Sequence, residues 1–244
     1  MKCAWDGKRR GPGGFTLVEL LVVMGIIGLL ISLLLPAVNV AITAARKAGT
    51  ANIITQLDTA LAAFKGDWGI YPPSQSGLDG NTRSGEVALA FYLLGPEGKG
   101  WGALAPATQK TPFGGSSSTA TQFYKPYYVS EQSLDPAFGI QDAFRPSKAI
   151  LYYRFEPAEA NPYRLADDST GASANATANF ATQTQFEILV KPNNRWVRDT
   201  YVLISAGADR LYGHVKLDAN GKLIPATAAT DAGISCDDVT NFKY

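Results

Sequence analysis

The feature that most constrains this chain is a long apolar run near its N-terminus. From Phe15 the sequence reads FTLVELLVVMGIIGLLISLLLPAV, and Glu19 is the one charged residue between Phe15 and Leu35. Roughly 20 helical residues, rising about 1.5 Å each, cross the hydrocarbon core of a bilayer. The run therefore predicts a membrane-spanning helix over about residues 15–38.

The segment before this run predicts how the helix is oriented and processed. Residues 1–14 read MKCAWDGKRRGPGG, and their basic side chains place the N-terminus on the cytoplasmic side of the membrane. An ordinary secretory signal is cleaved after its apolar region, whereas the small pair Gly13-Gly14 comes before it. Cleavage after Gly14 would remove residues 1–14 as a leader and leave the anchor on the mature chain, with a new amino group on Phe15.

Glu19 is unusual because a carboxylate inside an apolar span costs on the order of 2.5–3.5 kcal/mol on insertion scales. Such a residue needs a partner, and the new amino group of Phe15 would lie one helical turn away. The two groups could pair within one chain or between neighbouring chains, where the low dielectric of the membrane strengthens an ion pair. We expect this pairing to fix the register of assembling subunits. The alternative is a Glu19 that reaches the membrane edge and has no role.

The order of these residues resembles a known signal. Lys8-Arg9-Arg10, followed by Gly14-Phe15-Thr16-Leu17-Val18-Glu19-Leu20, is similar to the class III signal of type IV prepilins and type II secretion pseudopilins. The resemblance implies that an inner-membrane prepilin peptidase cuts between Gly14 and Phe15 and methylates Phe15. It also implies that Glu19 guides assembly. Many family members carry a proline at the position of Pro36, where it bends or loosens the helix.

Physical chemistry also marks Pro36 as a weak point of the helix. An interior proline removes one backbone hydrogen bond and clashes with the preceding turn, which costs about 3 kcal/mol. Gly25 and Gly28 lower the helix propensity further, by roughly 1 kcal/mol each relative to alanine. Our hypothesis is that the helix unwinds locally between Gly25 and Pro36 in an assembled filament.

The helical pattern continues beyond the membrane segment. Apolar side chains recur at spacings of three and four, which predicts one apolar stripe that a globular head must cover; they are Val40, Ala44, Ala48, Ala51, Ile54, Leu57, Leu61 and Phe64. Gly66 is the expected stop. The predicted organisation is therefore a leader over 1–14, a long helix over 15–66 and a globular head over 67–244.

The head is expected to be α+β, with the long helix packed on a small antiparallel sheet as in the pilin family. Glu86–Leu94 predicts a short buried helix. The strand candidates are Ala149–Phe155, Gln185–Val190 and Thr200–Ser205. Asn220-Gly221 is typical of a two-residue hairpin turn between Lys216-Leu217 and Lys222-Ile224.

The resemblance to major pseudopilins extends to a candidate calcium site. The segment Thr200–Gly207, followed by Ala208-Asp209 and later by Asp237-Asp238, is similar to the C-terminal part of those proteins, where a loop commonly binds calcium. Asp209, Asp237 and Asp238 are carried over as candidate ligands, because carboxylate oxygens suit this ion. This sequence departs from the pattern in its longer segment Leu211–Ser235 and in the basic Arg210. Solvated loop aspartates are the alternative.

Several functions are disfavoured by what the sequence lacks. A net charge of +1 argues against a broad nucleic-acid-binding surface. The chain has one histidine, His214, and no Walker-type loop, H-E-x-x-H or C-x-x-C pattern. No enzymatic activity is expected, apart from a role as substrate of the peptidase. Cys3 lies in the leader, so Cys236 would be the single cysteine of the mature chain, expected as a small half-buried residue.

Three functions remain open at this point. The first is a structural subunit of a type II secretion pseudopilus, inserted once in the bacterial inner membrane with its head in the periplasm. Its partners would be the prepilin peptidase, other copies of itself, minor pseudopilins and the inner-membrane assembly platform. The second is a type IV pilin for adhesion, motility or DNA uptake. The third is a monomeric, membrane-anchored module that binds a ligand with aromatic side chains; the candidates for it are Trp101, Tyr127, Tyr128, Tyr152, Tyr153 and Trp196.

Overall fold

The computed structural model describes ten ranges of the chain. They are residues 15–74, 83–95, 98–102, 111–112, 123–129, 139–164, 183–213, 215–217, 223–225 and 236–242. The chain divides into two compact units, Met1–Ala44 and Ala45–Tyr244. The leader with Gly14, and His214, lie outside the described residues.

Helix α1 runs from Leu17 to Trp68 and contains Pro36 in its interior. The predicted end at Gly66 is wrong by two residues. The Trp68 indole packs against Tyr124 at a centroid distance of 4.9 Å and donates a hydrogen bond to the Tyr127 hydroxyl at 2.8 Å, which holds the last turn in place. Gly69, with φ of +80°, then ends the helix, and its N–H donates to the Lys65 carbonyl at 2.8 Å.

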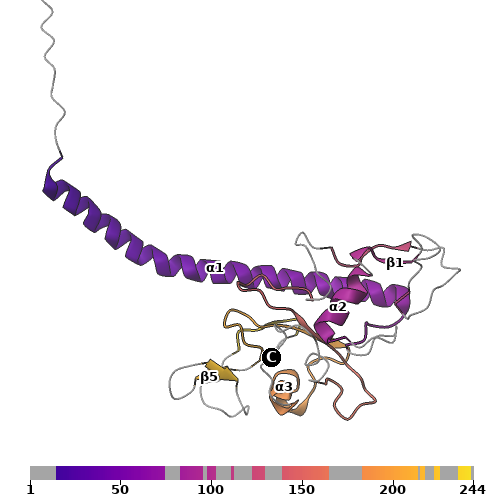
Figure 1. Ribbon diagram of the computed structural model, residues 1–244. Helices are drawn as coiled ribbons and strands as arrows, with labels where there is room; N and C mark the ends of the chain where they lie inside the picture. The colour runs from indigo at the N-terminus through magenta and orange to yellow at the C-terminus, as the bar shows by residue number, and fades with distance from the viewer. Residues whose placement is uncertain are drawn as a thin grey trace, which may run out of the picture. The chain divides into compact units, whose positions relative to one another are not determined.

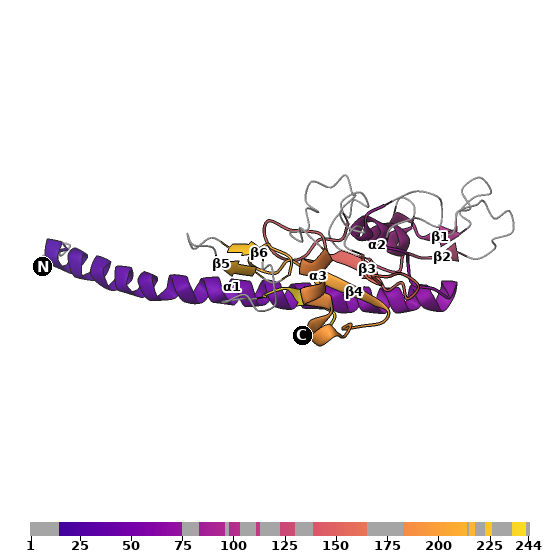
Figure 2. The same ribbon diagram turned by 90° about the horizontal axis from the view of Figure 1, so that it is seen from below.

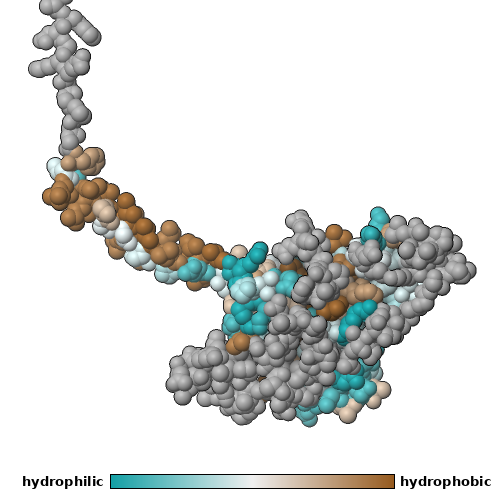
Figure 3. All heavy atoms as spheres, viewed as in Figure 1, coloured by the Kyte–Doolittle hydropathy of each residue, from teal (hydrophilic) through white to brown (hydrophobic). Residues whose placement is uncertain are grey.

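The part of α1 that belongs to the first unit is apolar on all sides and exposed. Leu17, Leu33 and Val40 are 77%, 69% and 72% exposed. Figure 3 shows most of this stretch as hydrophobic, with paler residues along one edge. Among the described residues, α1 is the one helix whose length and apolar composition suffice to cross a membrane.

The part of α1 that belongs to the second unit is amphipathic instead. Ile54, Leu57, Leu61 and Phe64 confirm the second half of the predicted stripe, and Thr50 and Ala60 are buried beside them. The first half of the predicted stripe is wrong, because Val40, Ala44, Ala48 and Ala51 are exposed. Helix α2, Gly85–Leu94, confirms the short buried helix and contributes Leu89, Tyr92 and Leu93 to the same core. Figure 1 shows α2 lying against the second half of α1.

The central sheet has the order β3-β4-β7 and is antiparallel. Strands β3, Leu151–Arg154, and β4, Tyr201–Ser205, confirm two of the three predicted strands. Leu151 pairs with Ile204, and Arg154 pairs with Tyr201. The third strand, β7, covers Val239–Thr240 and pairs with the end of β4.

The third predicted strand, Gln185–Val190, is wrong, because this segment lies in helix α3, Gln183–Val190. Its sequence, QFEILV, is too short for apolar residues alone to separate the two structures. The buried residues Phe186, Leu189 and Val190 are spaced by three and four positions, which is the spacing of one helix face. A short 3-10 turn, η3, follows at Pro192–Asn194.

The two faces of the central sheet belong to two hydrophobic cores. Tyr152, Tyr201 and Leu203 face the core made with α1 and α2. Tyr153, Val202 and Ile204 face a second core made with α3. The alternation of side chains along β3 and β4 therefore divides the head into layers, α1 and α2 on one face and α3 on the other.

Four short strands complete the described head. Strands β1, Trp101–Gly102, and β2, Phe123–Tyr124, pair with each other. Strands β5, Val215–Leu217, and β6, Leu223–Pro225, form the predicted hairpin, which Figure 2 shows beside the central sheet. The register pairs Leu217 with Leu223, one residue away from the pairing with Ile224 that a two-residue turn would set. Asn220-Gly221 itself lies outside the described residues. The arrangement is α+β and agrees with a pilin-like fold.

Candidate functional site

The first candidate site is the start of α1, where Thr16 and Glu19 cap the helix reciprocally. The Thr16 N–H and hydroxyl both donate to Glu19 Oε2, at 3.0 and 2.9 Å. The Glu19 N–H donates in return to Thr16 Oγ1 at 3.2 Å. This arrangement is a capping box, in which the two residues satisfy N–H groups that the helix leaves unpaired.

The capping box gives Glu19 a partner that the sequence reasoning missed. The signal was present as T-x-x-E ahead of an apolar run, which is the pattern of such a box. The carboxylate is directed at the backbone of Thr16, the residue that follows Phe15 in the chain. Glu19 is therefore held at the helix start, beside the residue that cleavage would turn into the new N-terminus.

Pro36 leaves the described helix intact. Helix α1 is continuous from Leu17 to Trp68, and nothing lies within 4 Å of a Cβ built on Gly25 or Gly28. Open space at both glycines leaves room for another helix to approach closely. The hypothesis of unwinding between Gly25 and Pro36 concerns the assembled filament and stays a prediction.

The second candidate site is the loop after β4, residues 206–213, to which Asp237 and Asp238 bind. Asp237 Oδ2 accepts hydrogen bonds from the N–H groups of Ala208 and Asp209 at 2.6 and 3.0 Å. Asp238 Oδ2 accepts one from the N–H of Gly213 at 2.6 Å. The structure thus brings the three predicted aspartates to one loop.

Gly207 explains why Asp237 can come so close to this loop. Its φ of +61° lies in the region that favours glycine, and a Cβ built there would stand 2.6 Å from the Asp237 carbonyl oxygen. Any side chain at this position would push Asp237 away. The sequence order Gly-Ala-Asp therefore fits the loop geometry.

The three carboxylates differ in how well their charge is compensated. Burial raises the pKa of Asp209 to about 6; the N–H of Leu211 lowers it in part, and the Asp237 carboxylate raises it again. Burial also holds the pKa of Asp238 well above its usual range. Asp237 Oδ1 and Asp238 Oδ1 are buried and have no hydrogen-bond partner. Ionising Asp209 and Asp238 is therefore less favourable here than in water.

These two oxygens would suit a hard cation such as calcium. In the part of the chain that the structure describes, however, no group of three or more His, Cys, Asp or Glu side chains is arranged to hold a metal ion. The calcium prediction therefore stays a prediction.

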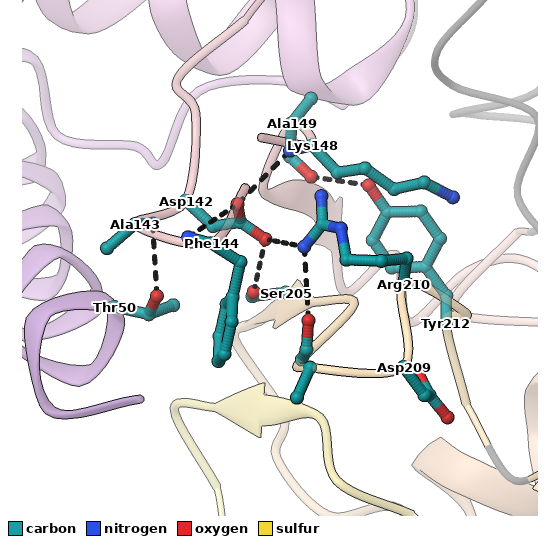
Figure 4. Close-up of polar contacts among 12 residues, drawn as sticks. Thr50, Asp142, Ala143, Phe144, Lys148, Ala149, Ser205, Asp209, Arg210 and Tyr212 are labelled. Carbon is teal, nitrogen blue, oxygen red and sulfur yellow. Dashed lines mark hydrogen bonds and ion pairs between the residues drawn. The ribbon is translucent and has the colours of Figure 1, made fainter. Parts of the chain in front are cut away.

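A buried network that the sequence reasoning did not foresee lies beside this loop (Figure 4). The Arg210 guanidinium donates to Asp142 Oδ2 at 2.8 Å and to the Gly207 carbonyl at 3.0 Å. Ser205 donates to the same carboxylate oxygen at 3.0 Å. Asp142 and Arg210 are far apart in the sequence, so no local pattern could have indicated their pairing.

The aromatic residues proposed as a ligand-binding surface lie mostly in the cores. Trp101, Tyr128, Tyr152 and Tyr153 are at most 6% exposed, while Tyr127 and Trp196 are half-buried. Trp101 stacks on Tyr92 and donates a hydrogen bond to its carbonyl at 2.8 Å. Their main role is packing, as is usual for aromatic residues in small heads. Cys236 is half-buried and packs against the core on the α3 side.

Comparison with known proteins gives one match. A family model described as the prokaryotic N-terminal methylation motif matches residues 9–35, which include Gly14, Phe15 and Glu19. No curated protein and no solved structure matches the chain.

Proposed function

We propose that this chain, a type IV pilin-like protein with a class III signal, is a structural subunit of a type II secretion pseudopilus. Its subunits would polymerise through their N-terminal helices to support protein export. The observation that carries the proposal is the exposed apolar first half of α1, which begins at the Thr16–Glu19 capping box. Such a surface is stable only against lipid or against other apolar helices.

Processing would precede assembly. Before cleavage the chain would cross the bacterial inner membrane once, with its head in the periplasm. The prepilin peptidase would then cut between Gly14 and Phe15 and methylate the new amino group. Glu19, already held at the first turn, would meet this amino group in its own chain or in the neighbouring one. Further partners would be other copies, minor pseudopilins and the inner-membrane assembly platform; no nucleic acid is expected.

Intact mass spectrometry of the membrane-purified protein tests the processing. We expect a mass that starts at Phe15 and includes one methyl group, in cells that contain the prepilin peptidase. Cells without the peptidase are the control and should retain the full chain. An uncleaved mass in both strains would reduce the N-terminus to a plain anchor and refute the proposal.

Two substitutions of Glu19 separate helix capping from charge pairing. Glu19→Gln keeps a side chain that can accept the cap hydrogen bonds but removes the charge, whereas Glu19→Ala removes both. Both variants should be processed and membrane-bound, and neither should form filaments when particles sheared from cells are examined by electron microscopy. Filaments of normal length from Glu19→Ala would contradict the role in assembly, and filaments from Glu19→Gln alone would reduce Glu19 to a cap.

A type IV pilin for adhesion, motility or DNA uptake is the second candidate. Many surface pilins close a C-terminal loop with a disulfide, and the mature chain would keep Cys236 as its single cysteine. This favours the secretion role. Deletion of the gene should abolish export of a secreted protein and leave motility and DNA uptake unchanged; the opposite result would favour the pilin.

A monomeric ligand-binding module is the third candidate, and the burial of its aromatic residues argues against it. It requires a chain that stays monomeric in the membrane after processing. Cross-linking between cysteines introduced into the first half of α1 distinguishes this monomeric module from a filament subunit. Ladders of multimers are expected only from the filament subunit.

Calcium binding by the head is a separate proposal. Asp237 Oδ1 and Asp238 Oδ1 would be the ligand atoms, with carbonyl oxygens of the loop completing the site. Calorimetric titration of the purified protein with calcium should give a binding isotherm that Asp237→Asn weakens at least tenfold. Identical isotherms for the two proteins would rule this site out.

A further inference from the structure

We propose that Arg210 is a built-in cation that fixes the loop of residues 206–213 to the rest of the head, so that the head folds without a metal ion. The guanidinium stands where a carboxylate and a loop carbonyl converge. Its Nη1 donates both to Asp142 Oδ2 and to the Gly207 carbonyl. Arginine keeps its charge at any pH that a protein tolerates, so this cation is permanent.

Asp142 is fully buried, and Arg210 is mostly shielded from solvent. The Asp142 side chain is 0% exposed and that of Arg210 is 16% exposed. A buried carboxylate without a countercharge is strongly unfavourable, and removing one partner of a buried pair is therefore much more harmful than removing both. Arg210 also has a φ of +66°, which non-glycine residues rarely adopt. The fold tolerates this backbone conformation at the residue that delivers the guanidinium to Asp142.

Asp142 connects three segments through its two oxygens (Figure 4). Oδ1 accepts from the N–H groups of Phe144 and Lys148 at 3.3 and 3.1 Å, which shapes the loop of residues 142–148. Oδ2 accepts from Ser205 at the end of β4 and from Arg210. One carboxylate thus joins the loop before β3, the central strand and the loop of residues 206–213.

The loop of residues 142–148 in turn contacts the second half of α1. The Ala143 N–H donates to Thr50 Oγ1 at 3.1 Å. At Gly49, a built Cβ would stand 3.2 Å from the Ala143 Cβ, so the two backbones approach closely. Arg210 therefore stabilises, through Asp142, the loop of residues 142–148 that contacts the second half of α1.

The remaining contacts of the 206–213 loop also come from the chain itself. The Tyr212 hydroxyl donates to the Ala149 carbonyl at 2.6 Å, while Asp237 and Asp238 accept three of the loop's N–H groups. Each end of the loop is thus fixed by hydrogen bonds within the protein. A calcium ion at Asp237 and Asp238 would bind to a loop that is already formed.

Lys148 offers a matched control for the charge of Arg210. Its ammonium group is also close to this cluster, 5.1 Å from the centre of the Tyr212 ring, but no hydrogen bond to Asp142 is made by its side chain. Arg210→Met and Lys148→Met each remove one positive charge from the same neighbourhood. Only the first removes the donor to Asp142.

Thermal unfolding of the full chain in detergent, with chelator or with calcium, tests the proposal. In chelator we expect the wild-type head to unfold cooperatively with a well-defined midpoint, which added calcium raises only through its binding to the folded head. Arg210→Met should lower this midpoint by at least about 5 °C, and Lys148→Met by less than about 2 °C. Equal midpoints for the two variants, or a wild-type head that is unfolded in chelator before heating, would overturn the proposal.

Hydrogen exchange on the wild-type protein is a second test, and it does not require any variant to fold. The amides of Ala208, Asp209 and Gly213 should exchange at the same slow rate with and without chelator. Loss of their protection on chelation would show that a metal, and not Arg210, closes the loop.

Discussion

The two halves of α1 have one backbone structure but opposite surroundings. Up to Ala44 the helix is apolar on all sides and its large side chains are exposed. From Ala45 it exposes small and polar residues and buries one stripe, of which Leu57, Leu61 and Phe64 are 0% exposed. The second half is stabilised by the head, whereas the exposed first half would be stabilised by lipid or by other apolar helices.

The second half of α1 also makes polar contacts with the head. Three polar residues of α1 contact the head at intervals of roughly two turns, each with a different partner. Thr50 accepts from Ala143, Asp58 accepts from Tyr201, and Asp67 accepts from Tyr127. These contacts fix the rotation and register of the helix on the head, which apolar packing alone specifies less well.

The largest expected effect comes from truncating one apolar residue in each half. Phe64→Ala should lower the free energy of unfolding of the head by about 3–5 kcal/mol, because it leaves a cavity in the core. Leu29→Ala, in the exposed half, should leave that free energy unchanged. Urea unfolding of both variants in detergent, followed by tryptophan fluorescence, measures the difference. Equal losses would mean that both halves depend on the head.

The next effect concerns Asp58, which accepts hydrogen bonds from the Tyr201 hydroxyl at 2.8 Å and from the Asn241 side chain at 3.0 Å. Asp58→Ala should cost about 1–3 kcal/mol, since it leaves partly buried donors unpaired. Thr55→Ala is the control, because the Thr55 hydroxyl donates to the Ala51 carbonyl of its own helix and not to the head. Alanine favours the helix more than threonine or aspartate does, so a loss for Asp58→Ala no larger than that for Thr55→Ala would show that the docking contacts contribute nothing.

A smaller effect is expected from two glycines of the second half. Nothing lies within 4 Å of a Cβ at Gly66, so Gly66→Ala should stabilise the head by about 0.5–1 kcal/mol through helix propensity. At Gly49 the new methyl group would stand 3.2 Å from Ala143, so Gly49→Ala should gain less or lose stability. Chemical unfolding of the two variants measures the difference. Equal gains in the free energy of unfolding would mean that the loop around Ala143 moves aside without loss of stability.

The smallest effect is the pH dependence of the head. The pKa of Asp209 is about 6 in the folded chain, above the usual aspartate value of 3.8, so the folded state binds more protons than the unfolded state between these values. Stability from this group is therefore present at low pH and is lost as pH rises through about 6. The melting temperature, measured with chelator, should rise from pH 7 to pH 5 less in Asp209→Asn than in the wild type. An equal rise in the melting temperature of both proteins would show that Asp209 is not the group responsible.

The sequence predicted the elements whose signals are local. The long helix, α2, β3, β4 and the β5–β6 hairpin follow from periodicity and turn residues. Helix α3 was missed because QFEILV is compatible with both a strand and one helix face, and burial by the sheet decides between them. The docking contacts were out of reach, since Asp58 and Tyr201 are 143 positions apart and Asp142 and Arg210 are 68 apart.

The residues of the candidate sites could likewise be predicted only where their sequence signal is local. Phe15 and Glu19 could be identified because the signal is contiguous, and the capping box was readable in the same letters. The aspartates of the loop were named by resemblance, but their hydrogen bonds to backbone N–H groups depend on how residues 206–213 fold. Arg210 was noted only as a departure from the pattern, although the structure gives it a central position.

The strand order β3-β4-β7 has a consequence for how these molecules behave when crowded. Among the described residues, the longest strand of this sheet, β4, is in the middle, and the outer strands have four and two residues. Short edges offer few open N–H and C=O groups to a foreign strand, so aggregation by edge-to-edge pairing is disfavoured. Copies of this head at high local concentration are therefore not expected to form amyloid-like ladders through this sheet.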